Sequence, residues 1–163
     1  MNRKAIYPGT FDPVTYGHID IIERASRIYD KVFVGVAHNK NKKPLFSVKE
    51  RVDMLKKSVS HLDNVSIEDF ASLVINYAKK KNTRVIIRGL RMISDFEFEL
   101  QMALTNRKLA GEIETIFMMT SDSYSYLSSK LIKETSALGA DVKHFVPDFV
   151  EKKLKGKLSG KKK

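Results

Sequence analysis

The sequence contains no cysteine, and this absence removes several kinds of chemistry at once. Disulfide bridges, cysteine-ligated metal sites and thiol nucleophiles are all excluded. The chain also lacks any apolar run of about 18 residues, the length that a membrane-spanning helix needs. Few apolar residues precede Pro8, so we expect no signal peptide. Together these absences predict a cytoplasmic enzyme or binding protein with no membrane partner.

Several functional motifs are missing as well. The sequence has neither the phosphate-binding loop G-x-x-x-x-G-K-[ST] nor the dinucleotide motif G-x-G-x-x-G. The G-x-S-x-G turn of hydrolases is absent, and no Ser-His-Asp arrangement is evident. His38, His61 and His144 have no acidic or histidine partners at metal-binding spacing. Helix-turn-helix and RNA-recognition patterns are also lacking, so no nucleic-acid partner is expected.

Basic residues are concentrated at the C-terminal end. The chain has 163 residues and a formal net charge of +11, and residues 151–163 contribute seven lysines and one glutamate. The remaining +5 suits small anionic substrates without requiring a polymer. We predict one domain over residues 1–150, with a last helix that could extend to about residue 158, and a partly flexible lysine-rich tail over 151–163. A nucleic-acid or membrane-surface role for the tail is the alternative.

Apolar, β-branched runs alternate with helical patterns along the chain. Expected strands are 4–8, 32–37, 65–70, 84–88 and 114–119, with helices at about 18–29, 47–59, 71–81, 94–109, 128–139 and from 147. This alternation predicts an α/β fold, a single Rossmann-like, doubly wound domain with a five-stranded parallel sheet and helices on both faces. The expected inward residues of the third and fourth helices are Leu73, Val74, Tyr77, Ala78, Phe96, Leu100, Ala103 and Leu104.

The unusual residues of the chain follow its expected strands. They occupy residues 10–18 after the first strand, 38–43 after the second, 88–91 after the fourth and 120–130 after the fifth. The exit of the third strand, at 72–74, adds one more segment. In open parallel sheets, ligands bind beyond the carboxyl ends of the strands. We therefore expect five segments to converge on one edge of the sheet.

The segment YPGTFDPVTYGH at residues 7–18 joins the first strand to the first helix. Gly9, Thr10, Gly17 and His18 bring N–H groups, a hydroxyl and an imidazole to a helix N-terminus, where phosphate is favoured. Taken alone, His18 fits a structural helix-entry residue. In this setting we predict a hydrogen-bond donor that stabilises charge developing on a phosphate, with its protonation state left open by the sequence.

Cationic side chains follow two other strands. Arg88 and Arg91 lie three positions apart after the fourth strand, and paired arginines are suited to gripping phosphate oxygens. Lys42 and Lys43 lie in the loop after the second strand, where a solvated surface role is the alternative. At the ligand-binding edge, both pairs are predicted to contact phosphate.

Acidic and hydroxyl residues complete the pattern. Asp95, Glu97 and Glu99 fit favourable placement near a helix N-terminus. Glu99 could instead face the site, binding a ribose or adenine edge or ordering an arginine. Ser128 or Ser129 is the expected N-cap of the next helix, where hydroxyl and N–H groups could also hold a triphosphate. Cations, hydroxyls and one histidine without an obvious base indicate phosphoryl or nucleotidyl transfer, with Mg²⁺ accompanying a nucleoside triphosphate.

These segments resemble the bacterial phosphopantetheine adenylyltransferase family, within the nucleotidylyltransferase superfamily. TYGH at 15–18 is similar to the family's T/H-x-G-H signature, and SSKLIKE at 128–134 is similar to its second signature, S-S-S/T-x-x-K/R-E. KKP at 42–44, IRGLR at 87–91 and DFEFE at 95–99 also match. The resemblance covers about residues 3–150 in order.

The resemblance implies that ATP and 4′-phosphopantetheine give dephospho-coenzyme A and pyrophosphate, the penultimate step of coenzyme A biosynthesis. It implies that His18 is catalytic and stabilises the transition state at the α-phosphorus. The implied ATP-binding residues are Thr10, Phe11, His18, Gly89, Leu90, Arg91, Glu99, Tyr124, Ser125, Tyr126, Leu127, Ser128, Ser129 and Lys130. The implied 4′-phosphopantetheine-binding residues are Thr10, Lys42, Val74 and Arg88.

The resemblance also implies Mg²⁺ on the ATP phosphates without protein side-chain ligands, a homohexamer built as a dimer of trimers, and feedback inhibition by coenzyme A. Lys130 is a departure, because the second signature often has a third serine there; a lysine could still meet phosphate as a point charge. The alternative function is that of another nucleotidylyltransferase of the superfamily, acting on a different phosphorylated acceptor.

Overall fold

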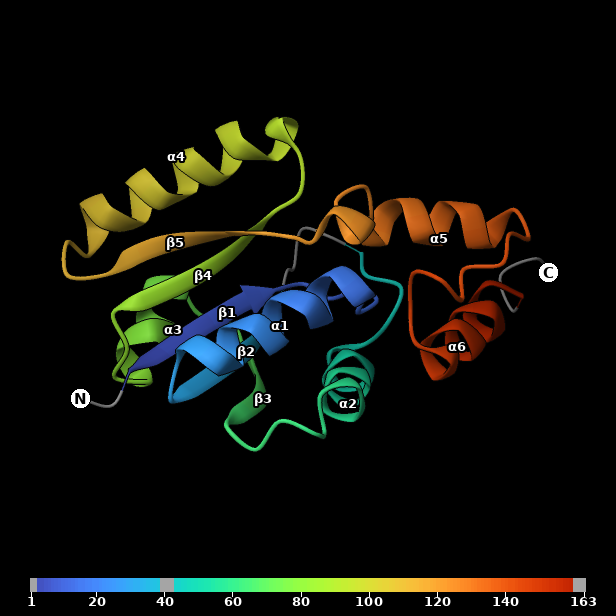
Figure 1. Ribbon diagram of the computed structural model, residues 1–163, viewed down its shortest axis with the longest axis horizontal. Helices are drawn as coiled ribbons and strands as arrows, with labels where there is room; N and C mark the ends of the chain where they lie inside the picture. The colour runs from blue at the N-terminus through green and yellow to red at the C-terminus, as the bar shows by residue number, and fades with distance from the viewer. Residues whose placement is uncertain (1–2, 39–42, 160–163) are drawn as a thin grey trace.

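A parallel sheet of five strands runs through the centre of the protein (Figure 1). The computed structural model describes residues 3–38 and 43–159. The strands are β1 (Lys4–Gly9), β2 (Lys31–Ala37), β3 (Val65–Phe70), β4 (Val85–Leu90) and β5 (Glu114–Met119). The helices are α1 (Tyr16–Ile28), α2 (Val48–Ser58), α3 (Val74–Lys80), α4 (Ile93–Leu109), the short 3₁₀ helix η1 (Asp122–Tyr124), α5 (Ser129–Ala137) and α6 (Asp148–Ser159).

The strand order is β3-β2-β1-β4-β5, and every neighbouring pair is parallel. The chain moves outward from β1 through β2 to β3 and then returns to the other side of β1 with β4. Strand order therefore reverses between β1 and β4, which is where a doubly wound sheet opens a crevice for ligands. The predicted Rossmann-like α/β fold with a five-stranded parallel sheet is confirmed.

Side chains of alternate strand residues point to opposite faces of the sheet, and each face has its own core. Ala5 and Tyr7 of β1 pack in the larger core with residues of α1, α2 and α6. Ile6, between them, packs in the smaller core with residues of α3. Figure 1 shows α1 on one side of the sheet and α3 on the other, so the predicted helix layers on both faces are present.

Local sequence sets where several helices begin. Thr15 caps α1 and Ser47 caps α2, each in a reciprocal capping box with the residue three positions later, His18 and Glu50 respectively. The Ser128 hydroxyl accepts from the Leu131 backbone N–H at 3.0 Å and caps α5, as the sequence predicts. Two of these caps lie at the carboxyl edge of the sheet, so the same hydroxyls that start the helices also shape that edge.

The predicted inward face of α3 is confirmed at Val74, Tyr77 and Ala78 but wrong at Leu73, and that of α4 needs correction. Leu73 precedes α3 and is 61% exposed, while Phe96 and Leu104 of α4 are 43% and 54% exposed. Leu100 is also exposed, and Ala103 is half-buried. α4 lies beside the sheet edge formed by β4 and β5 and presents much of its apolar surface to solvent (Figure 1). The pattern correctly predicts a helix here, but the apolar residues of α4 are spread around it rather than gathered on one inward face.

The C-terminal lysines belong partly to a packed helix. α6 spans Asp148–Ser159, and its Val150 and Leu154 are fully buried in the larger core. The predicted boundary after residue 150 falls inside this helix, and residues 160–163 lie outside the described ranges. Among the helices of 3–38 and 43–159, none combines the length and the apolar character required to cross a membrane.

Candidate active site

A cavity of about 620 Å³ lies at the carboxyl ends of the strands, where strand order reverses. The exits of β1, β4 and β5 and the loop before α2 all contribute to its wall. Among the described residues, the exit of β3 does not line the cavity, although the parallel strands place it at the same edge of the sheet, as predicted. The lining residues are Tyr7–Asp12, Thr15, Gly17, His18, Ile21, Lys43, Pro44, Arg88, Gly89, Arg91, Asp95, Phe98, Glu99, Thr120, Leu127–Lys130 and Lys133.

Phe11 shapes the turn after β1. Its φ of +51° lies in the left-handed region, which residues other than glycine rarely adopt. The buried Phe11 ring packs edge-on against His18, with ring centroids 5.0 Å apart. A Cβ at Gly9 would lie 2.8 Å from Phe11 Cζ, so glycine at position 9 makes room for the ring. Phe11 thus supports the imidazole through packing and lines the cavity beside it.

The two ring nitrogens of His18 have different surroundings. Nδ1 accepts a hydrogen bond from the Thr15 backbone N–H at 3.1 Å, so Nδ1 carries no proton. In a neutral ring the proton is therefore on Nε2. Within the described residues Nε2 has no hydrogen-bond partner, and the ring lines the cavity. The capping box that starts α1 thus selects the tautomer that can donate into the cavity.

The environment also keeps the ring neutral. Burial, together with the positive charges of Arg91 and Arg88, lowers the pKa of His18 to about 3. The protonation state that the sequence leaves open is therefore assigned: His18 is a neutral N–H donor at physiological pH. It is not poised to act as a general acid near neutrality, because that role needs a pKa close to the working pH.

Arg88 is held by three hydrogen bonds. Its Nε and one Nη donate to the two carboxylate oxygens of Glu99 at 2.8 and 2.6 Å, and its other Nη donates to the Pro8 carbonyl at 2.7 Å. Burial would lower the pKa of Arg88, but the hydrogen bonds and charge of Glu99 raise it. Glu99 thus orders an arginine, which is one of the two roles that the sequence left open for a Glu99 facing the site. Glu97, by contrast, is exposed.

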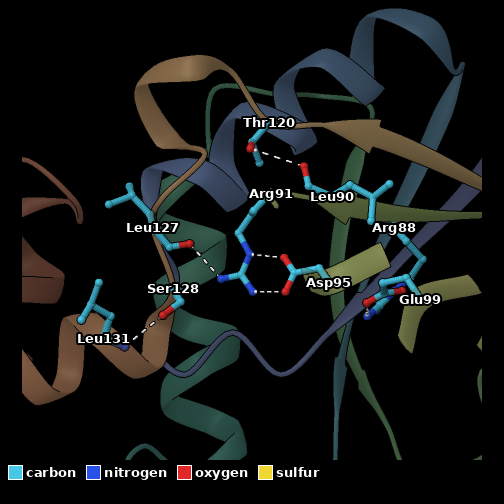
Figure 2. A network of polar contacts seen from close by, with 9 residues as sticks. All are labelled: Arg88, Leu90, Arg91, Asp95, Glu99, Thr120, Leu127, Ser128 and Leu131. Carbon is cyan, nitrogen blue, oxygen red and sulfur yellow. Dashed lines mark hydrogen bonds and ion pairs between the residues drawn. The ribbon is translucent and has the colours of Figure 1, made fainter. Parts of the chain in front are cut away.

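Arg91 is oriented in a similar way. Its Nε and one Nη donate to the Asp95 carboxylate at 3.1 and 3.3 Å, and its other Nη donates to the Leu127 carbonyl at 2.8 Å (Figure 2). Asp95 and Glu99 are four residues apart on α4, one helical turn, so a single helix aligns both arginines. The two guanidinium groups are therefore held in fixed orientations by groups of the protein itself.

The second predicted signature enters the cavity at the start of α5. Leu127, Ser128, Ser129 and Lys130 all line it, and the Ser129 hydroxyl donates to the Pro13 carbonyl at 2.8 Å. Lys130 is strongly exposed, with its ammonium 4.0 Å from Glu134. The start of α5 thus lies at the cavity wall, where the backbone N–H groups of a helix's first turn favour an anion.

Some predicted site residues lie elsewhere. Val74 is half-buried at the start of α3 and packs against the smaller core. Leu90 contributes a carbonyl that accepts from the Thr120 hydroxyl at 3.5 Å (Figure 2) and from the Thr120 N–H at 3.1 Å, but it does not line the cavity. Tyr124, Ser125 and Tyr126 are also outside the lining, and Tyr124 stacks on Tyr16. Lys42 lies outside the described residues, whereas Lys43 lines the cavity.

Three residues of the site region were not singled out from the sequence. Asp12 is buried, lines the cavity and bonds to Lys133 Nζ at 2.6 Å. Arg51 is 1% exposed, and its Nη1 donates to the Thr10 carbonyl at 2.6 Å. Arg51 lies at a position where the pattern of α2 predicts an inward residue, so its charge was a sequence signal for a buried polar role. For Asp12 and Lys133, the only signal was that each lies in or beside one of the two signature segments, and this signal is weaker.

The lining is cationic overall. Among the residues of 3–38 and 43–159, five lining side chains are positive (Lys43, Arg88, Arg91, Lys130 and Lys133), and three are negative (Asp12, Asp95 and Glu99). Each of these carboxylates is bonded to one of the cations, so the surplus charge suits a polyanionic ligand. In the described part of the chain, no cluster of three His, Asp or Glu could hold a metal ion. The arrangement can bind phosphates and stabilise charge that builds on them.

Comparison with known proteins identifies the relatives of this chain. Residues 6–135 match the family model described as cytidylyltransferase-like. The chain is 54% identical to the phosphopantetheine adenylyltransferase of Gloeobacter violaceus over 156 residues, which covers 96% of this chain and 97% of that protein. It is 51% identical to the phosphopantetheine adenylyltransferase of Dictyoglomus thermophilum, over 98% of both chains.

Solved structures with lower identity share the fold. A Plasmodium falciparum nicotinic acid mononucleotide adenylyltransferase complexed with NaAD superposes with a TM-score of 0.70 at 14% identity, covering 99% of this chain and 96% of that one. A bifunctional NMN adenylyltransferase/ADP ribose pyrophosphatase from Francisella tularensis gives a TM-score of 0.65 at 19% identity, covering 90% of this chain and 44% of that one. At these identities, the likeness concerns the fold alone.

Proposed function

The chain belongs to the phosphopantetheine adenylyltransferases, within the cytidylyltransferase-like family, and on this premise we propose that it transfers the adenylyl group of ATP to 4′-phosphopantetheine. The products are dephospho-coenzyme A and pyrophosphate. The observation that carries the proposal is the neutral ring of His18, whose Nε2–H has no partner among the described residues. This ring lines the same cavity as Arg88 and Arg91, and each arginine is held by a carboxylate. This is a set of donors suited to phosphates.

The reaction needs positioning and charge stabilisation more than proton transfer. A phosphate oxygen of 4′-phosphopantetheine attacks the α-phosphorus and forms a new P–O bond. The bond from that phosphorus to the α,β-bridging oxygen breaks, and pyrophosphate leaves with that oxygen. Because the attacking phosphate is already an anion, no general base is required. His18 Nε2–H donates to an α-phosphate oxygen as charge builds in the transition state.

The two substrates share the cavity in our proposal. ATP contacts Thr10, Phe11 and the turn Leu127–Lys130, with its triphosphate at the N-terminus of α5. The phosphate of 4′-phosphopantetheine meets Arg88, with Lys42 and Val74 on the same side by resemblance. Gly89, Leu90, Arg91 and 124–126 complete the ATP side. Because Glu99 is bonded to Arg88, we assign its contribution to orienting that arginine.

We propose that ATP enters as its magnesium complex. Asp12, Asp95 and Glu99, the three carboxylates of the cavity, are each bonded to a cationic side chain. A cation carried by the triphosphate fits such a lining better than one held by protein carboxylates. The ion would neutralise phosphate charge and keep the triphosphate in a fixed shape, while the side chains hold the complex in place.

We further propose a homohexamer, a dimer of trimers, inhibited by coenzyme A and located in the cytoplasm. The exposed apolar residues of α4 support assembly, because monomeric proteins rarely leave so many neighbouring apolar side chains uncovered. Coenzyme A contains the adenylylated product, so it fits the same cavity in part. The cytoplasmic location stays a prediction.

The first experiment measures pyrophosphate release by the purified full chain. We expect release only when ATP and 4′-phosphopantetheine are both present, and none when nicotinamide mononucleotide or glycerol phosphate replaces the acceptor. CTP in place of ATP should give little product. Turnover with another phosphorylated acceptor, at a higher kcat/KM than with 4′-phosphopantetheine, would instead assign a sister activity of the superfamily.

The role of His18 can be tested in the same assay. His18→Ala removes one transition-state donor, and we expect kcat to fall by roughly 10²-fold or more with a small change in the KM for ATP. His61→Ala is the matched control, since His61 is exposed and bonded to Glu23 on the surface. Equal turnover of the His18 and His61 variants would disprove the assignment.

A further inference from the structure

Asp12 is the point where three separate parts of the cavity wall meet. It follows Phe11 in the turn after β1 and is 4% exposed. Its Oδ1 accepts from the Phe46 backbone N–H at 2.9 Å, and its Oδ2 accepts from the Leu45 backbone N–H at 2.9 Å. Oδ2 also accepts from Lys133 Nζ on α5 at 2.6 Å. One carboxylate thus ties the first turn to the loop before α2 and to the second signature.

Arg51 holds the same loop from the other side. Its Nε donates to the Phe46 carbonyl at 3.2 Å, and its Nη1 donates to the carbonyls of Thr10 at 2.6 Å and Ala37 at 3.2 Å. Phe46 is therefore bonded through its N–H to Asp12 and through its C=O to Arg51. Since Phe46 and Arg51 are both 1% exposed, this arrangement is part of the packed interior and has little freedom to shift.

The loop that is held in this way reaches the cavity. Lys43 and Pro44, just before Leu45 and Phe46, are lining residues. We infer that Asp12 is a positioning residue that sets the 43–46 segment, and with it Lys43, against the phosphate-binding turn. Arg51 assists it from the opposite side. This inference rests on the proposed function, in which the segment after β2 belongs to the acceptor side of the cavity.

The hydrogen bonds of Asp12 explain why a carboxylate is required. Both of its oxygens act as acceptors, and one of them faces a backbone N–H and an ammonium group together. Asparagine has the same shape but one acceptor oxygen, so its NH₂ group would face either the Phe46 N–H or the pair formed by the Leu45 N–H and Lys133. Two donors facing each other in a buried site are unfavourable, and the segment would move away.

The test compares Asp12→Asn with Glu68→Gln, a matched control. Glu68 on β3 also bonds two groups, Tyr77 Oη at 2.8 Å and Lys81 Nζ at 2.6 Å, but it lies outside the cavity lining. We expect Asp12→Asn to raise the KM for 4′-phosphopantetheine about tenfold or more, with less than about a threefold change in the KM for ATP. Glu68→Gln should leave both KM values as in the wild type. An equal rise in both KM values, or no rise in either, overturns the inference.

Amide hydrogen exchange gives a readout that does not depend on activity. In the wild type, the Leu45 and Phe46 amides donate to Asp12 and should exchange slowly. Asp12→Asn should accelerate exchange at these two amides more than in the strands, and unchanged protection there overturns the inference. If Asp12→Asn does not fold, Arg51→Lys replaces it, since lysine has a single nitrogen in place of the separate Nε and Nη1 that bond these carbonyls. A wild type without acceptor-dependent pyrophosphate release would refute the proposed function, and the exchange result would still decide the positioning role.

Discussion

The two ring nitrogens of His18 are distinguished by the first turn of α1. The Thr15 N–H occupies Nδ1, so the neutral ring carries its proton on Nε2. An imidazolium beside Arg88 and Arg91 would be strongly disfavoured, because both arginines are themselves fixed by carboxylates and cannot swing away. Burial is the largest cause of the lowered pKa of His18, and the positive charges that suit phosphates lower it further.

This neutrality predicts a pH-dependent contribution to stability. The unfolded chain protonates His18 near pH 6.5, whereas the folded chain does so only near pH 3. Between these values the unfolded state binds more protons, so the free energy of unfolding falls as pH falls. His18→Gln removes this contribution. In urea unfolding, we expect the wild type to lose up to about 1.4 kcal/mol per pH unit more than the variant below pH 6.5.

His61→Gln is the control for this experiment, because it removes an exposed histidine that is paired with Glu23 on the surface. Its stability curve should fall with decreasing pH almost as steeply as that of the wild type. Parallel curves for the wild type and His18→Gln would show that the folded protein accepts a proton on His18 without cost, and the neutral-donor assignment would fail.

At the scale of elements, helix starts serve both folding and the site. Thr15 and Ser47 make the same kind of capping box, on α1 and α2. The residue three positions after the cap is His18 in the α1 box and Glu50 in the α2 box. The two caps thus stabilise their helices by the same mechanism, but only the α1 cap is coupled to the catalytic imidazole.

Thr15→Ala and Ser47→Ala should therefore differ in activity and agree in stability. Each loses one capping hydroxyl, and we expect each to lower the free energy of unfolding by about 1 kcal/mol. Thr15→Ala should also lower kcat about threefold to tenfold, because the His18 ring loses one of its two contacts with Thr15. Denaturant unfolding measures the loss of stability, and steady-state kinetics on the same samples measures the change in kcat. A loss of kcat in both variants would show a general effect of stability.

The sequence predicts the elements well because their determinants are local. The Ser47-to-Glu50 box and the hydroxyl of Ser128 each act within three residues. The hydrogen bonds of Asp12 are different, because its partners lie 33, 34 and 121 residues away in the sequence. A single sequence does not show which distant N–H or ammonium group will reach a given carboxylate. Asp12, Arg51 and Lys133 could therefore be assigned only once the chain was folded.

The predicted site roles of Val74 and of residues 124–126 have a different basis. Their roles came from resemblance, and the ligand-free cavity does not include them. Arg88, Arg91 and His18 were predicted both from resemblance and from their positions at strand exits, and they do meet in one cavity.

At the scale of the whole molecule, α4 has two functions on its two sides. Asp95 and Glu99 orient the arginines of the cavity, while Ile93, Phe96 and Leu104 are exposed apolar residues of the same helix. The neighbouring edge strand β5 also has exposed apolar residues, since Ile116 and Met119 are 41% and 72% exposed. An apolar face over a helix and an adjacent edge strand is suited to a second copy of the chain.

We therefore expect the wild type to sediment as a species larger than one chain, and Leu104→Asp to shift it toward single chains. A buried aspartate at a subunit contact is unfavourable, whereas on an exposed face of the monomer it is tolerated. Leu138→Asp, at another exposed leucine beyond α5, is the control and should leave the assembly intact. Analytical ultracentrifugation measures the assembly, and circular dichroism verifies that both variants fold. A wild type that sediments as a single chain, or a Leu104→Asp variant that assembles like the wild type, would exclude the α4 face as the subunit contact.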